Sequence, residues 1–222
     1  DSHKCTIWFS VPTLLIYLGT LKAFSRKNLN SIKKFIFGGE AYPLEKLIIL
    51  FKTYNDKADF FNVYGPTECT CICSAHKIIE SDFSDMNGIP PLGKINENFN
   101  YQILDDENQL VKKGKVGELC LIGDNVGKGY YNDQKNTMKH FLLNPLNKNF
   151  NEIMYKTGDL VVENIKNNFI YFKGRKDNQI KHMGYRIELE EIEYGLNSLS
   201  YIKQSAVFHK NINGISKIHA VV

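Results

Sequence analysis

The sequence lacks a membrane-spanning apolar run, a block of like charges and a signal-peptide pattern at its start. The 28 lysines and arginines exceed the 24 aspartates and glutamates by only four, and they are scattered along the chain. This distribution gives little support to nucleic-acid binding, so we expect neither a nucleic acid nor a membrane as a partner. The five cysteines are an odd number without disulfide-framework spacing, which favours a reducing, cytoplasmic location.

Three of these cysteines, Cys69, Cys71 and Cys73, occupy alternate positions. Structural zinc sites commonly pair their ligands as Cys-x-x-Cys, a turn that aims both sulfurs at one ion. Alternation with a period of two instead predicts a strand that carries all three thiols on one face. We therefore expect small polarizable side chains lining a strand rather than a metal centre.

Apolar residues make up 43% of the 222 residues, which predicts a packed core in one large domain or two small ones. Near the start, a β-rich run from residue 6 is broken at Pro12, where a helix is expected to begin. A buried strand within residues 32–38 then precedes a helix over about 43–54, and residues 58–64 form another strand. This alternation indicates α/β layering, with ligands expected at the carboxyl ends of the strands.

After about residue 90, the pattern changes to short strands and Gly or Asp-Asp turns without helical periodicity. It predicts a β-barrel or a small antiparallel sheet that continues as far as Asp177. From residue 178, a hairpin precedes a helix whose first turn is rich in glutamate, which suits the helix dipole. The change near Asp177 marks an expected domain boundary.

Four stretches, taken in order, resemble the adenylate-forming (AMP-binding) superfamily. They are NVYGPTE (62–68), GELCLIGDNVGKGYYND (117–133), YKTGDL (155–160) and GRKDNQIKHMGYRIELEEIE (174–193). Pro66 after Gly65, and ELEEIE after GYRI, make the chain look most like amino-acid adenylation domains of nonribosomal peptide synthetases and D-alanine–carrier protein ligases. The glycines of GDNVGKGYY do not follow a dinucleotide-binding pattern, and we interpret them as structural turns.

The resemblance implies a fold class of α/β plus β-barrel. Residues 1–89 would end the second α/β subdomain, residues 90–176 would form a distorted β-barrel, and residues 177–222 would begin a mobile α+β lid. It also implies two half-reactions. An amino-acid carboxylate attacks the α-phosphate of ATP to give aminoacyl-AMP, with Mg²⁺ present, and a phosphopantetheine thiol on a partner carrier protein then takes the acyl group.

By the same resemblance, Tyr64 stacks on adenine, Asn62 holds its exocyclic amine, Thr67 contacts the α-phosphate, and Glu68 binds Mg²⁺. Asp159 would accept hydrogen bonds from the ribose hydroxyls, and Arg175 would reach the ribose or phosphate. The remaining nucleotide-binding residues implied are Gly39, Glu40, Ala41, Val63 and Gly65. Taken alone, the Tyr-Gly-Pro-Thr stretch is also typical of a plain turn, and Asp159 of a cap.

The resemblance makes Asp177 the hinge of the lid and turns Gly184 and its neighbours toward the pantetheine tunnel. The alternative for Lys181, His182 and Arg186 is a solvated hairpin face. The implied substrate pocket draws on uncharged positions, which favours a modest apolar amino acid and leaves D-alanine open. These pocket positions are Phe9, Ile36, Gly38, Val63, Cys71 and Ile72.

Three elements of the family pattern are absent from the sequence: the phosphate loop, the aspartate for the substrate amine and the C-terminal catalytic lysine. We therefore expect an internal fragment that is inactive alone. Two other functions stay open, namely an acyl- or aryl-acid CoA ligase and a catalytically dead nucleotide-binding module. Glu68, Asp159 and Arg175, all present, argue against the second.

Overall fold

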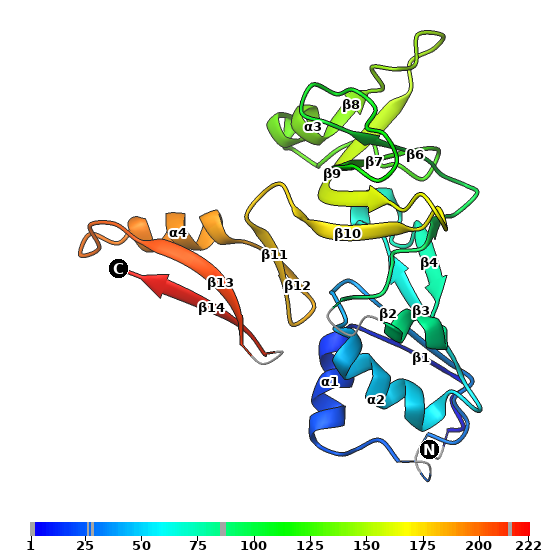
Figure 1. Ribbon diagram of the computed structural model, residues 1–222. Helices are drawn as coiled ribbons and strands as arrows, with labels where there is room; N and C mark the ends of the chain where they lie inside the picture. Colours follow the sequence, from blue (N-terminus) through cyan, green and yellow to red (C-terminus); the bar gives the residue numbers. More distant parts are fainter. Residues whose placement is uncertain (1–2, 26, 28, 85–87, 213–214) are drawn as a thin grey trace.

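The structure is a computed structural model that describes residues 3–25, 27, 29–84, 88–212 and 215–222. Two sheets form the body of the molecule, and a third group of elements extends to one side of it (Figure 1). No helix in this described part is long and apolar enough to cross a membrane.

The first sheet is mixed, with the strand order β1-β2-β3-β4-β5. Its first three strands are parallel, whereas β4 and β5 pair antiparallel to their neighbours. The strands are β1 (Ile7–Ser10), β2 (Lys34–Gly38), β3 (Asp59–Tyr64), β4 (Ser74–Lys77) and β5 (Lys94–Ile95), and the accompanying helices are α1 (Pro12–Thr20) and α2 (Leu44–Tyr54). The expected α/β layering is therefore present.

Alternation along β2 and β3 places large aromatic rings against α2. Phe35 and Phe60 are fully or almost fully buried and stack with their ring centroids 5.1 Å apart. Tyr54, at the end of α2, lies 5.3 Å from Phe35 between ring centroids. Because such rings bury large apolar areas, this core holds β2 and β3 against α2, and the two strands end at Gly38 and Tyr64.

The second sheet is antiparallel, with the order β10-β9-β7-β6, and β8 pairs with β9. Its strands are β6 (Asn100–Leu104), β7 (Val116–Ile122), β8 (Phe141–Leu143), β9 (Ile153–Glu163) and β10 (Ile170–Arg175). A separate apolar cluster that includes Leu119, Tyr155 and Val161 lies on this sheet. The described strands form an open sheet, which agrees with the antiparallel sheet expected for this part of the chain.

Two local expectations are wrong. The stretch after residue 90 contains a helix, α3 (Gln134–His140), because Asp133 caps it by accepting a hydrogen bond from the Asn136 amide at 3.0 Å. The three alternating cysteines do not form a strand. A short 3-10 helix, η1 (Thr67–Cys69), leads into two left-handed residues, Thr70 (φ +56°) and Cys71 (φ +75°).

This turn buries two of the three sulfurs and exposes the third. Cys69 and Cys73 are completely buried, whereas Cys71 is exposed. Among the residues the structure describes, no group of three or more His, Cys, Asp or Glu side chains could hold a metal ion.

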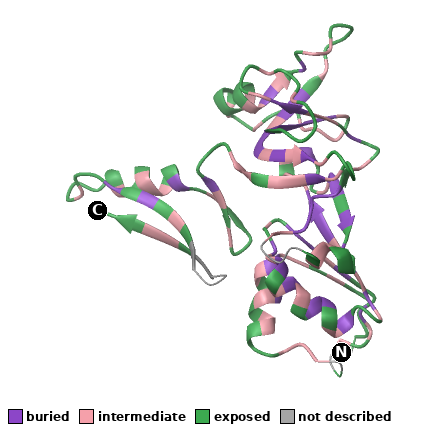
Figure 2. Ribbon diagram, in the orientation of Figure 1, coloured by how far each residue is buried: buried purple, intermediate pink, exposed green. Residues whose placement is uncertain are grey.

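The third part contains the hairpin β11 (Gln179–His182) and β12 (Tyr185–Glu188), the helix α4 (Leu189–Asn197), and the antiparallel pair β13 (Ala206–Ile212) and β14 (Ile215–Val221). The hairpin lies next to the body, whereas α4 and the C-terminus lie away from it (Figure 1). Buried residues concentrate in the two sheets of the body and are sparse in this third part (Figure 2). We call the third part, residues 177–222, the lid.

Candidate active site

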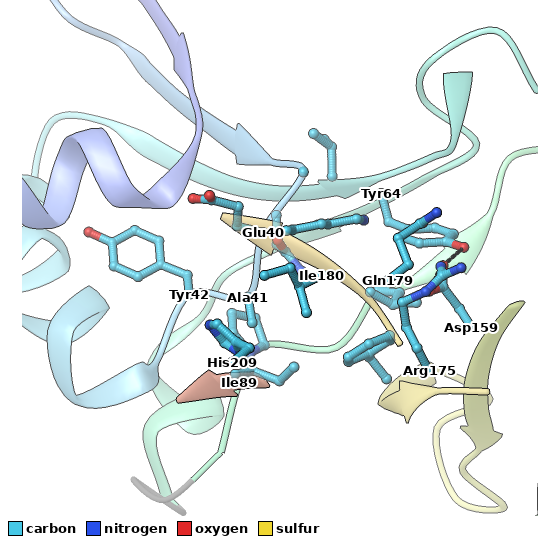
Figure 3. A pocket seen from close by; sticks show the side chains of 17 residues that line it. Glu40, Ala41, Tyr42, Tyr64, Ile89, Asp159, Arg175, Gln179, Ile180 and His209 are labelled. Carbon is cyan, nitrogen blue, oxygen red and sulfur yellow. Dashed lines mark hydrogen bonds and ion pairs between the residues drawn. The ribbon is translucent and has the colours of Figure 1, made fainter. Parts of the chain in front are cut away.

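A cavity of about 220 Å³ opens where the ends of β2 and β3 meet β9, β10 and the β11–β12 hairpin (Figure 3). Its position follows from the topology, because the carboxyl ends of neighbouring parallel strands lie at one edge of a sheet. Residues far apart in sequence line it, from Gly39 to His209. The cavity therefore joins both sheets and the lid.

Tyr64 and Asp159 are the centre of the polar wall. The Tyr64 hydroxyl donates to Asp159 Oδ2 at 2.5 Å, and both residues are buried. Burial, followed by the nearby Asp159 charge, raises the pKa of Tyr64 well above its usual value, so the phenol stays protonated and remains a donor.

Arg175 connects Asp159 to Asp177. Its Nη1 donates to Asp159 Oδ1 at 2.6 Å, while Nε and Nη2 donate to the two carboxylate oxygens of Asp177 at 2.6 Å each. Desolvation raises the pKa of Asp177, but the hydrogen bond and charge of Arg175 outweigh it and leave this pKa lowered. One guanidinium thus holds a carboxylate of β9 and a carboxylate at the start of the lid, in a bidentate arrangement with the second.

Lys181 of β11 reaches over the same wall from the lid. Its ammonium lies 5.6 Å from the centre of the Tyr64 ring, within cation–π range. The residue as a whole is exposed, but desolvation of its buried end lowers the pKa of Lys181 against the opposing attraction of Asp159. The Lys181 ammonium and the Asp159 carboxylate therefore lie at the same wall of the cavity.

Glu68 lies outside this cavity, in the 3-10 turn that follows β3. Tyr130 donates to its Oε1 at 2.6 Å, and Arg186 Nη1 lies 2.7 and 2.9 Å from its two carboxylate oxygens. Desolvation raises the pKa of Glu68, but the Tyr130 hydrogen bond and the Arg186 charge outweigh it and lower the pKa. Glu68 is therefore a carboxylate with strong donors on both oxygens.

Glu40 receives the tip of the lid hairpin. The Gly184 amide donates to its Oε1 at 2.6 Å, and Thr13 donates to its Oε2 through its hydroxyl at 2.5 Å and its amide at 3.2 Å. Gly39, just before it, has φ +85°, a conformation that favours glycine. This turn presents Glu40 to the lid.

Most residues predicted to bind a nucleotide line the cavity, namely Gly39, Glu40, Ala41, Asn62, Val63, Tyr64, Asp159 and Arg175. Gly65 and Thr67 do not line it, and Thr67 is exposed. The Asn62 side-chain nitrogen donates to the Pro91 carbonyl at 2.8 Å. That hydrogen bond orients the amide, whose oxygen is an acceptor.

The residues predicted for the substrate pocket are more dispersed, and only Val63 of the six lines the cavity. Phe9 and Ile36 pair in register across β1 and β2, on the face away from the Phe35 core. Phe9 is 60% exposed. Cys71 is exposed in the left-handed turn, and Ile72 follows it before β4.

Sequence reasoning did not identify several residues of the site. Tyr130, which holds Glu68, lies in the glycine-rich stretch that we interpreted only as turns. Its sequence signal was a pair of tyrosines, Tyr130 and Tyr131, after two glycines, and this pattern pointed to no partner. The further cavity residues are Tyr42, Ile89, Pro90, Leu92, Phe172, Gln179, Ile180, Lys181 and His209.

Known proteins resemble this chain over most of its length. The D-alanine–D-alanyl carrier protein ligase of Lacticaseibacillus rhamnosus is 33% identical over 199 residues, which cover 90% of this chain and 38% of that protein. Bacitracin synthase 1 of Bacillus licheniformis is 37% identical over 193 residues, covering 86% of this chain and 4% of the synthase. The chain thus spans about two-fifths of the length of such ligases.

Solved structures share the fold. The Vibrio cholerae adenylation domain AlmE, crystallised with glycyl-adenosine-5'-phosphate, gives a TM-score of 0.83 at 27% identity, covering 99% of this chain and 41% of AlmE. Holo-PA1221, an NRPS protein with adenylation and PCP domains, gives 0.85 at 23% identity and covers 97% of this chain and 36% of its own. The family model described as "AMP-binding enzyme" matches residues 1–131 of the 222. With more than half of its length matched, this chain belongs to the AMP-binding enzyme family.

Proposed function

We propose that this chain forms the nucleotide-binding centre of an adenylate-forming ligase that activates an amino acid and passes it to a carrier protein. The observation that carries the proposal is the Tyr64–Asp159–Arg175 network at the wall of the cavity. The ring of Tyr64 suits stacking on a base, and the Asp159 carboxylate suits the hydroxyls of a ribose. The Arg175 guanidinium suits a phosphate.

In the first half-reaction, an amino-acid carboxylate oxygen attacks the α-phosphorus of ATP, and the bond to the β-phosphate breaks to release pyrophosphate. Asp159 would accept hydrogen bonds from the ribose hydroxyls, and Arg175 would hold Asp159 in place while it faces the nucleotide. Thr67 would contact the α-phosphate. This chemistry depends on positioning and charge neutralisation rather than on a covalent protein group.

Glu68 is the residue that would hold Mg²⁺ with the phosphates. Its carboxylate oxygens suit a hard cation, and Mg²⁺ is commonly bound by one or two protein carboxylates together with substrate phosphates. A bound Mg²⁺ would neutralise phosphate charge. Tyr130, on the body, would keep the Glu68 carboxylate oriented by its 2.6 Å hydrogen bond.

In the second half-reaction, a phosphopantetheine thiol attacks the acyl carbonyl and AMP leaves. We assign residues 1–89 to the α/β subdomain, 90–176 to a distorted barrel and 177–222 to a lid that turns about Asp177. Support comes from the hairpin at the cavity and from the carrier-protein ligases among the relatives. The uncharged pocket positions favour a small apolar amino acid as substrate.

The protein that carries this chain should catalyse amino-acid-dependent exchange of pyrophosphate into ATP. We expect exchange with one small apolar amino acid and none with fatty or aryl acids, measured across a panel of all three. Exchange only with fatty or aryl acids would favour a CoA ligase. Absence of exchange and of ATP binding would favour the dead nucleotide-binding module. The isolated 222 residues should show no turnover.

Fixing the hinge should separate the two half-reactions. Asp177→Pro restricts the backbone at the start of the lid, so adenylate formation should persist while thioester formation falls at least about tenfold. Asp177→Ala is the matched control, because it removes the carboxylate that pairs with Arg175 without fixing the backbone. Equal loss of both half-reactions in the proline variant, measured by exchange and by carrier loading, would refute the hinge assignment.

A further inference from the structure

Glu68 accepts hydrogen bonds from two parts of the protein. Tyr130 belongs to the body, in the loop between β7 and α3, whereas Arg186 belongs to strand β12 of the lid. The Glu68 side chain is 8% exposed, and Arg186 Nη1 approaches both of its oxygens, at 2.7 and 2.9 Å. In this arrangement the lid supplies the positive charge that a largely buried carboxylate requires.

Two positively charged side chains lie opposite each other in the β11–β12 hairpin of the lid. Lys181 of β11 and Arg186 of β12 are register partners, and like charges directly opposite each other destabilise an antiparallel pair. Each cation instead meets the body: Lys181 faces Tyr64 and is attracted by Asp159, and Arg186 pairs with Glu68. The body therefore offsets a repulsion that the undocked hairpin would retain.

We propose that Arg186 is a positioning residue that docks the lid onto Glu68 only when no divalent cation is bound there. The inference rests on the proposed function, which assigns Glu68 to the cation. A divalent ion at Glu68 would compete with Arg186 for the carboxylate, because both would approach the same two oxygens and the ion would repel both hairpin cations. Once no cation is held there after the first half-reaction, Glu68 would be free to bind Arg186.

The Gly184 amide reports docking without any measurement of activity. It lies at the hairpin tip between the two strands and donates to Glu40 on the body at 2.6 Å. When the hairpin leaves, this amide loses its acceptor and should exchange with solvent faster. Its exchange rate therefore measures the docked population directly.

The test titrates the full chain with Mn²⁺ and ATP, following bound Mn²⁺ by electron paramagnetic resonance and Gly184 exchange by NMR. In the natural protein, Mn²⁺–ATP should accelerate Gly184 exchange. Arg186→Met should exchange faster before any addition and should bind Mn²⁺–ATP about three- to tenfold more tightly. The gain follows because Mn²⁺–ATP would bind only the undocked fraction of the natural protein. If the lid is about 90% docked, the apparent affinity of the natural protein is about tenfold lower than that of an undocked protein.

Two further variants sharpen the result. Arg186→Lys retains a charge but not the planar donor set, so it should fall between the natural protein and Arg186→Met. Tyr185→Ala changes a 72% exposed neighbour in the same strand and should match the natural protein in both readouts. Tightened binding in Tyr185→Ala as well would attribute the effect to general loosening of the hairpin and overturn the proposal.

A metal-free titration with AMP separates this inference from the proposed function. If AMP binds but Arg186→Met leaves both Mn²⁺–ATP affinity and Gly184 exchange unchanged, the competition at Glu68 is wrong and the nucleotide site stands. If neither AMP nor Mn²⁺–ATP binds, the proposed function fails and the inference fails with it.

Discussion

Asp159→Ala is expected to weaken AMP binding by roughly a hundredfold or more. Each charge-assisted hydrogen bond from a ribose hydroxyl contributes about 1.5–3 kcal/mol, and alanine would remove the acceptor for both. The substitution also removes the carboxylate that pairs with the Tyr64 hydroxyl and with Arg175 Nη1. Isothermal titration with AMP, combined with denaturant unfolding, measures both consequences.

The loss of unfolding free energy in Asp159→Ala should be smaller than the loss expected for an isolated ion pair. Removing one member of a buried pair costs about 3–5 kcal/mol, but Arg175 keeps its bidentate partner Asp177. Asp159→Asn is the matched control, since it keeps an oxygen for Tyr64 while losing the charge. An Asp159→Ala protein that is folded and binds AMP normally would refute the ribose assignment.

Gly65→Ala is expected to destabilise the α/β part by about 3 kcal/mol or more, beyond the usual cost of overpacking. A Cβ at this position would lie 2.0 Å from the Cys71 carbonyl oxygen and 2.8 Å from the Cys73 nitrogen. Both are backbone atoms, so no side-chain rotation relieves the clash. The displacement would also break the Cys73 amide hydrogen bond to Tyr64.

The single tryptophan, Trp8, packs against the core of the first sheet and provides the fluorescence signal for denaturant unfolding. Gly19→Ala is the matched control in the same unit, because its Cβ would meet only the Phe24 ring at an ordinary 3.6 Å. We expect that variant to be neutral or slightly stabilising in helix α1. Equal midpoints for the two variants would contradict the close approach of Gly65 to Cys71.

Local patterns predicted much of the body. Short apolar runs located β2 and β3, and the proline at position 12 marked the start of α1. These features depend on near neighbours in sequence, whereas Tyr64, Asp159 and Arg175 were singled out by the resemblance to a family. Their convergence at one cavity follows from parallel strands that end at a common edge.

The sequence did not predict the contacts between side chains that lie far apart along the chain. Glu68 meets Tyr130 and Arg186, which lie 62 and 118 residues away, and no local pattern specifies either partner. The cysteine alternation was misleading for a related reason. Backbone packing between Gly65 and Cys71 selects left-handed residues at Thr70 and Cys71, against the strand geometry that their side chains favour.

Charged and hydrogen-bonding groups join the lid to the body at Glu40, Glu68, Tyr64 and Arg175. Attraction between partly exposed charges weakens as salt is added, since the Debye length contracts from about 10 Å at 0.1 M salt to about 3 Å at 1 M. A lid that turns about Asp177, as proposed, would therefore leave the body more readily at high ionic strength.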